Sequence, residues 1–271
     1  MSEYGNSDEQ LNRAQATDAP KPSIVVNFTL LVGIVALIIG LVSLRFAIDA
    51  RDLSKENRQT ETGPRGRAIT LYQQPEDLGS FIETMAKSVV VVHCGDWSGS
   101  GWSYDVELSA GYLGTIITNH HVIENCIDKP EQLSIQYDDG GSTGLKEFEA
   151  SIYNYDEEND LALLDVKVAI PPLKVSNELA LPGQWTMTLG SPLGVSDLLV
   201  NAVTIGNMVG VEDQYYNFTT AIINPGNSGG PLLNSLGEVI GTNSLSWAST
   251  KDGVSNVAID IGVLCEAILK C

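Results

Sequence analysis

Short apolar runs separated by turn-forming residues recur along the chain from residue 89 onward. The runs are rich in valine, isoleucine, leucine and threonine, residues that favour extended strands, and turn residues bound them. They occupy residues 89–93, 114–118, 132–137, 161–166, 185–189, 200–205, 231–233 and 239–242. This pattern predicts an all-β domain.

Two stretches of the same region have a helical pattern instead. Within residues 75–87, apolar side chains recur at helical spacing: Leu78, Phe81, Ile82 and Met85. Residues 262–270, at the end of the chain, are also expected to be helical. We therefore predict one short helix before the first strand and another after the last strand.

One apolar run is much longer than the others and covers residues 24–44 without a charge. At about 1.5 Å per residue, a helix of this length spans roughly 31 Å, the thickness of the hydrocarbon core of a bilayer. A cleaved signal peptide would have a shorter apolar region and a small-residue cleavage site. Because Leu44 is followed by Arg45 and Phe46, with no such site, we favour an uncleaved membrane anchor.

These patterns divide the chain into four parts. Residues 1–22 are polar and are expected to be a disordered tail. A transmembrane helix covers residues 23–45, and a stalk and linker with mixed charges cover residues 46–67. The predicted β domain covers residues 68–271.

The formal net charge of −19 lies entirely on the β domain. From Ala68 onward the chain has seven lysines, no arginine and 26 acidic residues, whereas the preceding part is neutral. Nucleic acid requires a basic surface, so nucleic-acid binding is excluded. The charge could steer cationic substrates, but we favour a solvated acidic face that keeps the protein soluble.

The sequence Asn-Pro-Gly-Asn-Ser-Gly-Gly-Pro at residues 224–231 carries the strongest chemical signal. Glycines around Ser228 would let a substrate carbonyl approach the backbone N–H groups beside the hydroxyl. A serine nucleophile needs a base and a group that orients the base. His120 and His121 follow one predicted strand, and Asp160 precedes another. The order His, Asp, Ser is that of the chymotrypsin arrangement.

Five segments together resemble the trypsin-like serine proteases of the HtrA/DegP type. They are Gly99-Ser100-Gly101-Trp102, Thr118-Asn119-His120-His121-Val122, Asn159-Asp160-Leu161-Ala162-Leu163, Leu189-Gly190-Ser191-Pro192-Leu193-Gly194 and the segment at residues 224–233. The resemblance implies a chymotrypsin-like double β-barrel, in which the first barrel carries His and Asp and the second carries Ser. The full fold expected is this double barrel with a short C-terminal helix, preceded by a single transmembrane helix.

The resemblance also implies roles for individual residues. His121, which directly precedes the valine of the family pattern, would be the general base, and Asp160 would orient its ring. Ser228 would attack the substrate, and the N–H groups of Gly226 and Ser228 would form the oxyanion hole. His120 is interpreted as the solvent-facing neighbour of His121.

Substrate-binding residues follow from the same resemblance. Ile222, six residues before the serine, would lie at the base of the primary pocket, where a trypsin has an acid. The strand formed by Val257, Ala258 and Ile259 would pair with the substrate backbone. Two features depart from the family: Thr220 stands where an acid is frequent, and the sequence ends 43 residues after Ser228, leaving no room for a PDZ domain.

The function expected is that of a membrane-anchored serine endopeptidase acting in protein quality control or regulated proteolysis. Its partners would be polypeptide substrates, including unfolded ones, and the lipid bilayer through residues 24–44. No cofactor is expected. HtrA-type proteases often trimerise, so the resemblance allows a homo-oligomer. The alternative is a catalytically silent protease-like module that binds its partners while tethered to the membrane.

The four cysteines allow a disulfide or buried thiols. By analogy with the chymotrypsin arrangement, Cys94 and Cys126 are candidates for a disulfide near the catalytic histidine; the alternative is two inert thiols. A zinc site is not expected, because no Cys-x-x-Cys or His-x-x-x-His spacing occurs. His93 is interpreted as a strand residue.

Two signals conflict over the side of the membrane that the β domain occupies. The flank after the apolar segment carries Arg45, Arg51, Lys55 and Arg58, and this bias alone predicts a cytoplasmic domain. The even cysteine count, the candidate disulfide and the outward-facing habit of tethered HtrA-like proteases oppose it. We predict a single-pass membrane protein with an extracytoplasmic catalytic domain.

Overall fold

The computed structural model describes residues 70–138, 144–191, 202–213, 215–244 and 256–269. The predicted tail at residues 1–22, the transmembrane helix at residues 23–45 and the stalk at residues 46–67 lie outside these ranges. Within the described ranges, no helix has the length and apolar character needed to cross a bilayer.

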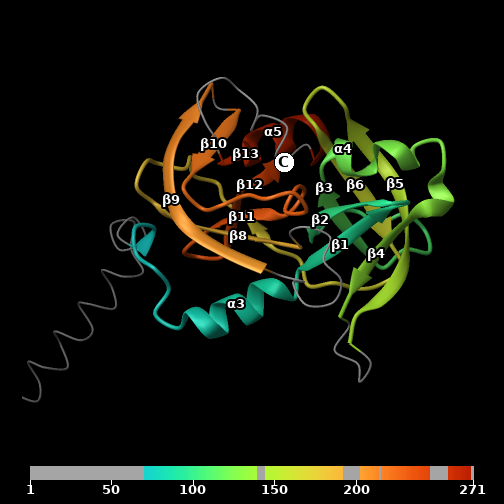
Figure 1. The fold of residues 1–271 in the computed structure, drawn as a ribbon, viewed down its shortest axis with the longest axis horizontal. Coiled ribbons are helices and arrows are strands. Elements are labelled where there is room, and N and C mark those ends of the chain that lie inside the picture. Colours follow the sequence, from blue (N-terminus) through green and yellow to red (C-terminus); the bar gives the residue numbers. More distant parts are fainter. Residues whose placement is uncertain (1–69, 139–143, 192–201, 214, 245–255, 270–271) are drawn as a thin grey trace, which may run out of the picture. The chain divides into compact units, whose positions relative to one another are not determined.

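The first half of the described chain forms a closed, six-stranded antiparallel barrel with the strand order β1-β2-β3-β6-β5-β4 (Figure 1). Its interior is filled by buried aliphatic side chains, among them Val92, Ile116 and Leu164. The strands are β1 (Val89–Cys94), β2 (Trp97–Ser103), β3 (Gly114–Thr118), β4 (Leu133–Tyr137), β5 (Lys146–Asp156) and β6 (Leu161–Val166).

The second half forms a seven-stranded sheet in the order β11-β8-β9-β10-β13-β12-β7, and a further pairing between β11 and β12 closes it into a second barrel. Only β7 pairs in parallel, with β12, among the described strands. The strands are β7 (Lys174–Val175), β8 (Trp185–Gly190), β9 (Ala202–Glu212), β10 (Tyr216–Thr219), β11 (Pro231–Asn234), β12 (Glu238–Ser244) and β13 (Asn256–Asp260).

The two barrels share one apolar core. Trp102 on β2 belongs to the same buried cluster as Met187 on β8 and Leu233 on β11. The Trp102 indole N–H also donates to the Thr242 hydroxyl on β12, at 3.3 Å. Burial of such apolar surface is the main force holding the barrels together, and it fixes the junction where chain segments from both barrels meet.

Helices cover the ends of this core. Helix α3 (Leu78–Ala86) begins at Asp77, whose carboxylate accepts the N–H of Ser80, and its Phe81 packs edge-on against Trp185. After β13, the helix α5 (Ile261–Leu264) begins at the cap residue Asp260 and continues into the π-helical turn η4 (Cys265–Leu269). The all-β double barrel with a short C-terminal helix is thereby confirmed.

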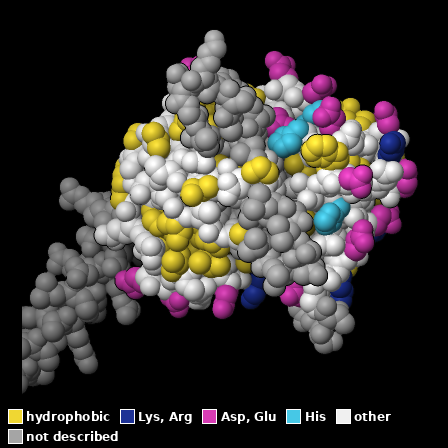
Figure 2. All heavy atoms as spheres, in the orientation of Figure 1, with side chains coloured by type: hydrophobic (Ala, Val, Ile, Leu, Met, Phe, Trp, Pro, Cys, Tyr) yellow, Lys and Arg dark blue, Asp and Glu magenta, His cyan; other side chains and the backbone are white. Residues whose placement is uncertain are grey.

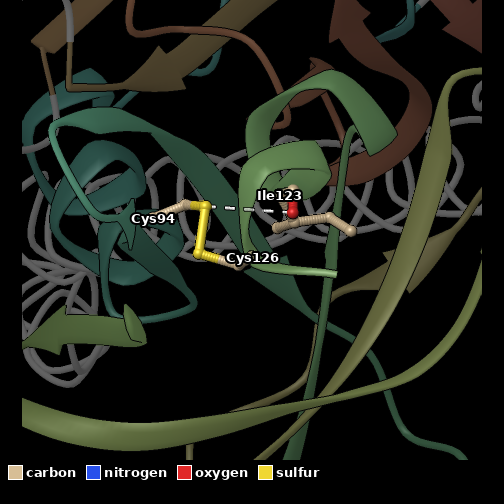
Figure 3. Close-up of a disulfide and its surroundings, with 3 residues drawn as sticks. All are labelled: Cys94, Ile123 and Cys126. Atoms are coloured by element: carbon tan, nitrogen blue, oxygen red, sulfur yellow. Dashed lines mark hydrogen bonds between the residues drawn. A yellow bond between two sulfur atoms is a disulfide. The ribbon is translucent and has the colours of Figure 1, made fainter. Parts of the chain in front are cut away.

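The segment between β3 and β4 is helical. It consists of α4 (His120–Ile123), followed by the 3₁₀ turns η1 (Glu124–Cys126) and η2 (Pro130–Gln132). Cys94 at the end of β1 and Cys126 in η1 form a disulfide, and the Cys94 sulfur lies 3.8 Å from the Ile123 carbonyl oxygen (Figure 3). The disulfide fastens this helical segment to the first barrel.

Candidate active site

The three residues of the predicted triad lie at ends of β strands. His121 is in α4, directly after β3; Asp160 directly precedes β6; and Ser228 lies in the loop before β11. Strand β3 pairs with β6, so the segments that carry His121 and Asp160 adjoin neighbouring strands of the first barrel. Ser228 comes from the second barrel, as expected.

His121 and Asp160 are joined by both side-chain and backbone contacts. The imidazole Nδ1 lies 2.9 Å from each carboxylate oxygen of Asp160. The backbone N–H of His121 donates to Asp160 Oδ1, also at 2.9 Å. Because a carboxylate only accepts hydrogen bonds, Nδ1 carries the proton and Nε2 of the neutral ring is left as a base.

Asp160 is itself held in place from two directions. The Ser244 hydroxyl at the end of β12 donates to Asp160 Oδ2 at 3.0 Å, and the Asn119 amide donates to the Asp160 carbonyl at 2.8 Å. Asp160 has a φ of 53°, in the left-handed region that non-glycine residues adopt rarely and mainly in turns or functional sites. The contacts with Ser244 and Asn119 therefore stabilise an unfavourable backbone conformation at Asp160, in which the carboxylate points toward His121.

The loop that carries Ser228 turns through two glycines with positive φ, Gly226 at 97° and Gly229 at 84°. The N–H of Asn227 donates to the Asn224 carbonyl and the N–H of Gly229 to the Asn243 carbonyl, each at 2.9 Å. Between them, the N–H groups of Gly226 and Ser228 have no acceptor among the described residues. These two donors are available to a ligand oxygen.

Close packing brings the serine loop against the histidine segment. A Cβ added to Gly229 would lie 2.1 Å from the Ser100 carbonyl oxygen and 3.1 Å from the Asn119 N, so no side chain fits there. Asn119 is the cap residue of α4. Ser228, which is 4% exposed, thus lies beside the start of the helix that carries His121.

No hydrogen bond joins the Ser228 hydroxyl to His121 Nε2 among the described residues. In active sites without a ligand, such bonds are often long and shorten when substrate binds. The arrangement contains the groups for acyl transfer: a hydroxyl, an oriented imidazole and two free backbone donors.

The prediction that Val257, Ala258 and Ile259 pair with substrate is wrong. They form β13, which is hydrogen-bonded to β10 on one side and to β12 on the other. Their side chains are buried as well. A strand paired on both edges has no backbone groups left for a peptide, so this strand belongs to the barrel wall.

Ile222 lies in the segment between β10 and the serine loop, and its side chain is 54% exposed, whereas the adjacent Ile223 is 2% exposed. The Thr204 hydroxyl on β9 donates to the Ile222 carbonyl at 2.6 Å, which holds this segment to β9. The Ile222 side chain is accessible to a substrate, and its role in a pocket stays a prediction. Thr220, at the position of the expected acid, accepts the N–H of Asn207.

His120 is not the solvent-facing neighbour that was expected. It is 7% exposed and stacks on Tyr155 of β5, with ring centroids 5.2 Å apart, whereas His121 is the exposed residue of the pair. In a helical turn, consecutive side chains point in different directions, so only one of the two contacts Asp160. His93 lies on β1, as predicted.

Two carboxylates contribute to the electrostatic environment of Tyr215. Burial, together with Tyr216 and the carboxylates of Asp156 and Asp160, raises the pKa of Tyr215 above its usual value. Tyr215 thus stays a neutral hydroxyl near the acid of the candidate triad. Figure 2 shows many acidic and few basic side chains on the face that it draws, in keeping with the acidic composition of the domain.

Within the described ranges, no group of three or more His, Cys, Asp or Glu side chains is placed to hold a metal ion. The same ranges contain no free cysteine, since Cys265 is also disulfide-bonded. Sequence reasoning missed the contacts of Ser244 and Ser100, which reach the site from distant strands, and the contact of Asn119 with the Asp160 carbonyl.

Residues 99–241 match the family model described as the trypsin-like peptidase domain. Serine protease HTRA3 of Homo sapiens is 35% identical over 144 residues, a stretch that covers 49% of this chain and 31% of that protein. Serine protease HTRA1 of Xenopus laevis is 36% identical over 143 residues, covering 49% and 29%. This chain therefore spans about a third of the length of the curated relatives that it matches.

Two solved structures are similar in fold. The serine endoprotease from Yersinia pestis has a TM-score of 0.56 at 27% identity, covering 73% of this chain and 67% of that chain. Deg5 has a TM-score of 0.54 at 30% identity, covering 69% of this chain and 90% of that chain. The double barrel described above is thus the chymotrypsin-like fold of HtrA-type proteases.

Proposed function

Because this chain belongs to the trypsin-like peptidase family, we propose that it is a serine endopeptidase of the HtrA type that hydrolyses peptide bonds through Ser228, His121 and Asp160. The observation that carries this proposal is the contact of His121 Nδ1 with both oxygens of Asp160, at 2.9 Å, beside a serine loop with two unpaired N–H groups.

In the acylation step, the Ser228 hydroxyl oxygen attacks the carbonyl carbon of a peptide bond. His121 Nε2 takes the hydroxyl proton and passes it to the leaving amine as the C–N bond breaks, which gives an acyl-enzyme. The N–H groups of Gly226 and Ser228 donate to the oxyanion. A water molecule then attacks the ester in the same way, releases the acid and restores the serine.

Asp160 keeps the imidazole in the reactive tautomer and stabilises its protonated form. The Ser244 hydroxyl on Asp160 Oδ2 and the His121 N–H on Asp160 Oδ1 keep the carboxylate from rotating. The chemistry requires no cofactor. Polypeptides, including unfolded ones, are the proposed substrates.

Specificity provides the first test of this proposal. Ile222 is apolar and accessible, so we expect cleavage after small or medium apolar residues such as Val, Ala or Leu, and not after Lys or Arg. The measurement is mass-spectrometric mapping of new termini in a denatured test protein, with Ser228→Ala as the control for contaminating proteases. A map dominated by Lys and Arg would refute the assignment of the pocket.

An Ile222→Asp variant should shift preference only partly toward basic residues, since a single charge does not rebuild a pocket. Val209→Asp is the matched control, because Val209 is a similarly exposed apolar residue on β9. The control variant should leave the cleavage map unchanged. An equal shift in both variants would show that added surface charge, rather than the Ile222 position, alters specificity.

The second candidate function is a catalytically silent module that binds polypeptides. The complete set of Ser, His and Asp side chains disfavours it. The two functions are separated by reaction with a serine-directed fluorophosphonate, which labels an activated serine and leaves a silent module unmodified.

We further propose that the domain is anchored in a membrane through residues 24–44 and lies outside the cytoplasm. The disulfide between Cys94 and Cys126 supports an oxidising compartment, because cytosolic thiols are kept reduced. Quality control or regulated proteolysis at the membrane is the proposed role. A homo-oligomer stays a prediction.

Orientation is tested by adding a membrane-impermeant protease to intact cells or right-side-out vesicles. The expected result is loss of the domain that begins at Ala68, since it lies on the accessible side. Protection of that domain until the membrane is breached would overturn the orientation and place Cys94 and Cys126 in a reducing compartment.

A further inference from the structure

Ser100 on β2 takes part in four hydrogen bonds, and two of them reach the serine loop. It is fully buried. Its N–H donates to the Ser228 carbonyl at 2.8 Å, and its hydroxyl donates to the Gly226 carbonyl at 2.7 Å. Its carbonyl accepts the Thr118 hydroxyl at 2.7 Å, and its hydroxyl oxygen accepts the N–H of Ser191 at 2.9 Å.

The N–H groups of Gly226 and Ser228 have no acceptor among the described residues. Ser100 holds the carbonyl of each of these residues. Anchoring a residue's carbonyl limits rotation of the chain around it, and so limits how far its own N–H can turn. One buried residue of the first barrel therefore holds both donor residues: its hydroxyl holds Gly226, and its backbone N–H holds Ser228.

Gly190 leaves room for the Ser100 hydroxyl. A Cβ on Gly190 would lie 2.8 Å from Ser100 Oγ and 2.8 Å from Asn227 Oδ1, so the glycine is needed for this approach. The N–H of Ser191 uses the acceptor capacity of the hydroxyl and turns its proton toward the Gly226 carbonyl. The segment containing Gly190 and Ser191 thus orients the Ser100 hydroxyl, which in turn holds Gly226 of the oxyanion hole.

We propose that Ser100 is a positioning residue, whose hydroxyl sets the geometry of the oxyanion hole and so accelerates acylation without contacting the substrate. This inference rests on the proposed function, because it concerns the rate of attack by Ser228. Donors that are fixed in advance stabilise a developing charge without reorganisation during the reaction. Loss of the hydroxyl should therefore slow the chemical step more than it weakens binding.

The experiment measures labelling of the full chain by a fluorophosphonate at several probe concentrations, which separates the limiting rate from the binding constant. In this reaction the Ser228 oxygen bonds to phosphorus, fluoride leaves, and the serine proton passes to His121. The phosphoryl oxygen requires the same N–H donors as a substrate oxyanion. We expect Ser100→Ala to lower the limiting rate about tenfold, less than the roughly 10²–10³-fold loss caused by removing a donor itself, with the binding constant little changed.

Ser103→Ala is the matched control. Ser103 is a buried serine on the same strand, but its hydroxyl donates to the Ile170 carbonyl, away from the serine loop. It should lower the melting temperature by a similar amount and leave the labelling rate within about twofold. Ser100→Cys, which keeps a weak donor of similar size, should have an intermediate rate and serves where Ser100→Ala does not fold.

The outcomes separate this inference from the proposed function. A wild-type chain that is not labelled, or labelling that survives Ser228→Ala, would overturn the proposed function itself. Normal labelling of the wild type at Ser228, together with an unchanged limiting rate in a folded Ser100 variant, would overturn only the role of Ser100. Equal slowing in Ser103→Ala would also overturn it, since the loss would then be general.

Discussion

Replacement of Ser228 by alanine is expected to lower the rate of peptide cleavage by at least about 10⁴-fold, because members of a catalytic triad act as a unit and the nucleophile is its centre. The substitution removes one oxygen from a residue that is already buried. The glycine turns and the hydrogen bonds of the loop use backbone atoms and persist without the hydroxyl. The fold should therefore be retained.

The measurement is the initial rate of cleavage of a peptide chosen from the cleavage map, for wild type and Ser228→Ala at equal concentration. The melting temperature of each protein checks that the fold is intact. Near-normal cleavage by a folded Ser228→Ala protein would mean that another residue is the nucleophile.

Replacement of Asp160 by asparagine should lower kcat on the order of 10⁴-fold, with a smaller change in KM. The asparagine oxygen and nitrogen occupy the positions of the two oxygens that now contact His121 Nδ1. Because an amide nitrogen donates, the ring is favoured in the tautomer that carries its proton on Nε2, which cannot act as the base. The Ser244 hydroxyl also loses a charged acceptor at Oδ2.

Glu157→Gln is the control for Asp160→Asn. Glu157 lies in the same turn, is exposed, and contributes only its backbone carbonyl to the site, as the acceptor of the Asp160 N–H. Activity of this variant should stay within about twofold of wild type. An equal loss in both variants would point to the charge of the turn, and not to the tautomer of His121.

The arrangement of His121, Asp160 and Ser228 was predictable from the sequence because of their neighbours. His121 and Asp160 lie next to apolar strands, and Ser228 lies among the glycines of a turn. Six of the strand predictions match the structure closely, since their apolar runs are buried in the barrels. Strand β2 was missed because glycine disfavours strands. Its glycines are required by packing: a Cβ on Gly99 would lie 2.6 Å from the Val122 side chain.

Strands β5 and β10 were missed for different reasons. Strand β5 carries charged residues on an exposed face. Its only sequence signal is the alternation of more exposed and less exposed residues from Lys146 to Ala150, which is too short to distinguish it from a loop. Strand β10 is only four residues long. Because β10 is not evident from the sequence, the pairing of β13 with β10 could not be predicted, and the sequence alone does not show that β13 is paired on both edges. Contacts such as Ser244 with Asp160 and Ser100 with Gly226 join distant segments, which local patterns do not encode.

The most direct test of the proposed function is to locate the fluorophosphonate adduct by mass spectrometry of peptides from the labelled protein. A single modified residue, Ser228, is expected in the wild type, and no adduct is expected in either Ser228→Ala or His121→Ala. The proposed function would be contradicted if a folded, wild-type chain carried no adduct at Ser228, or if Ser228 were labelled equally well without His121.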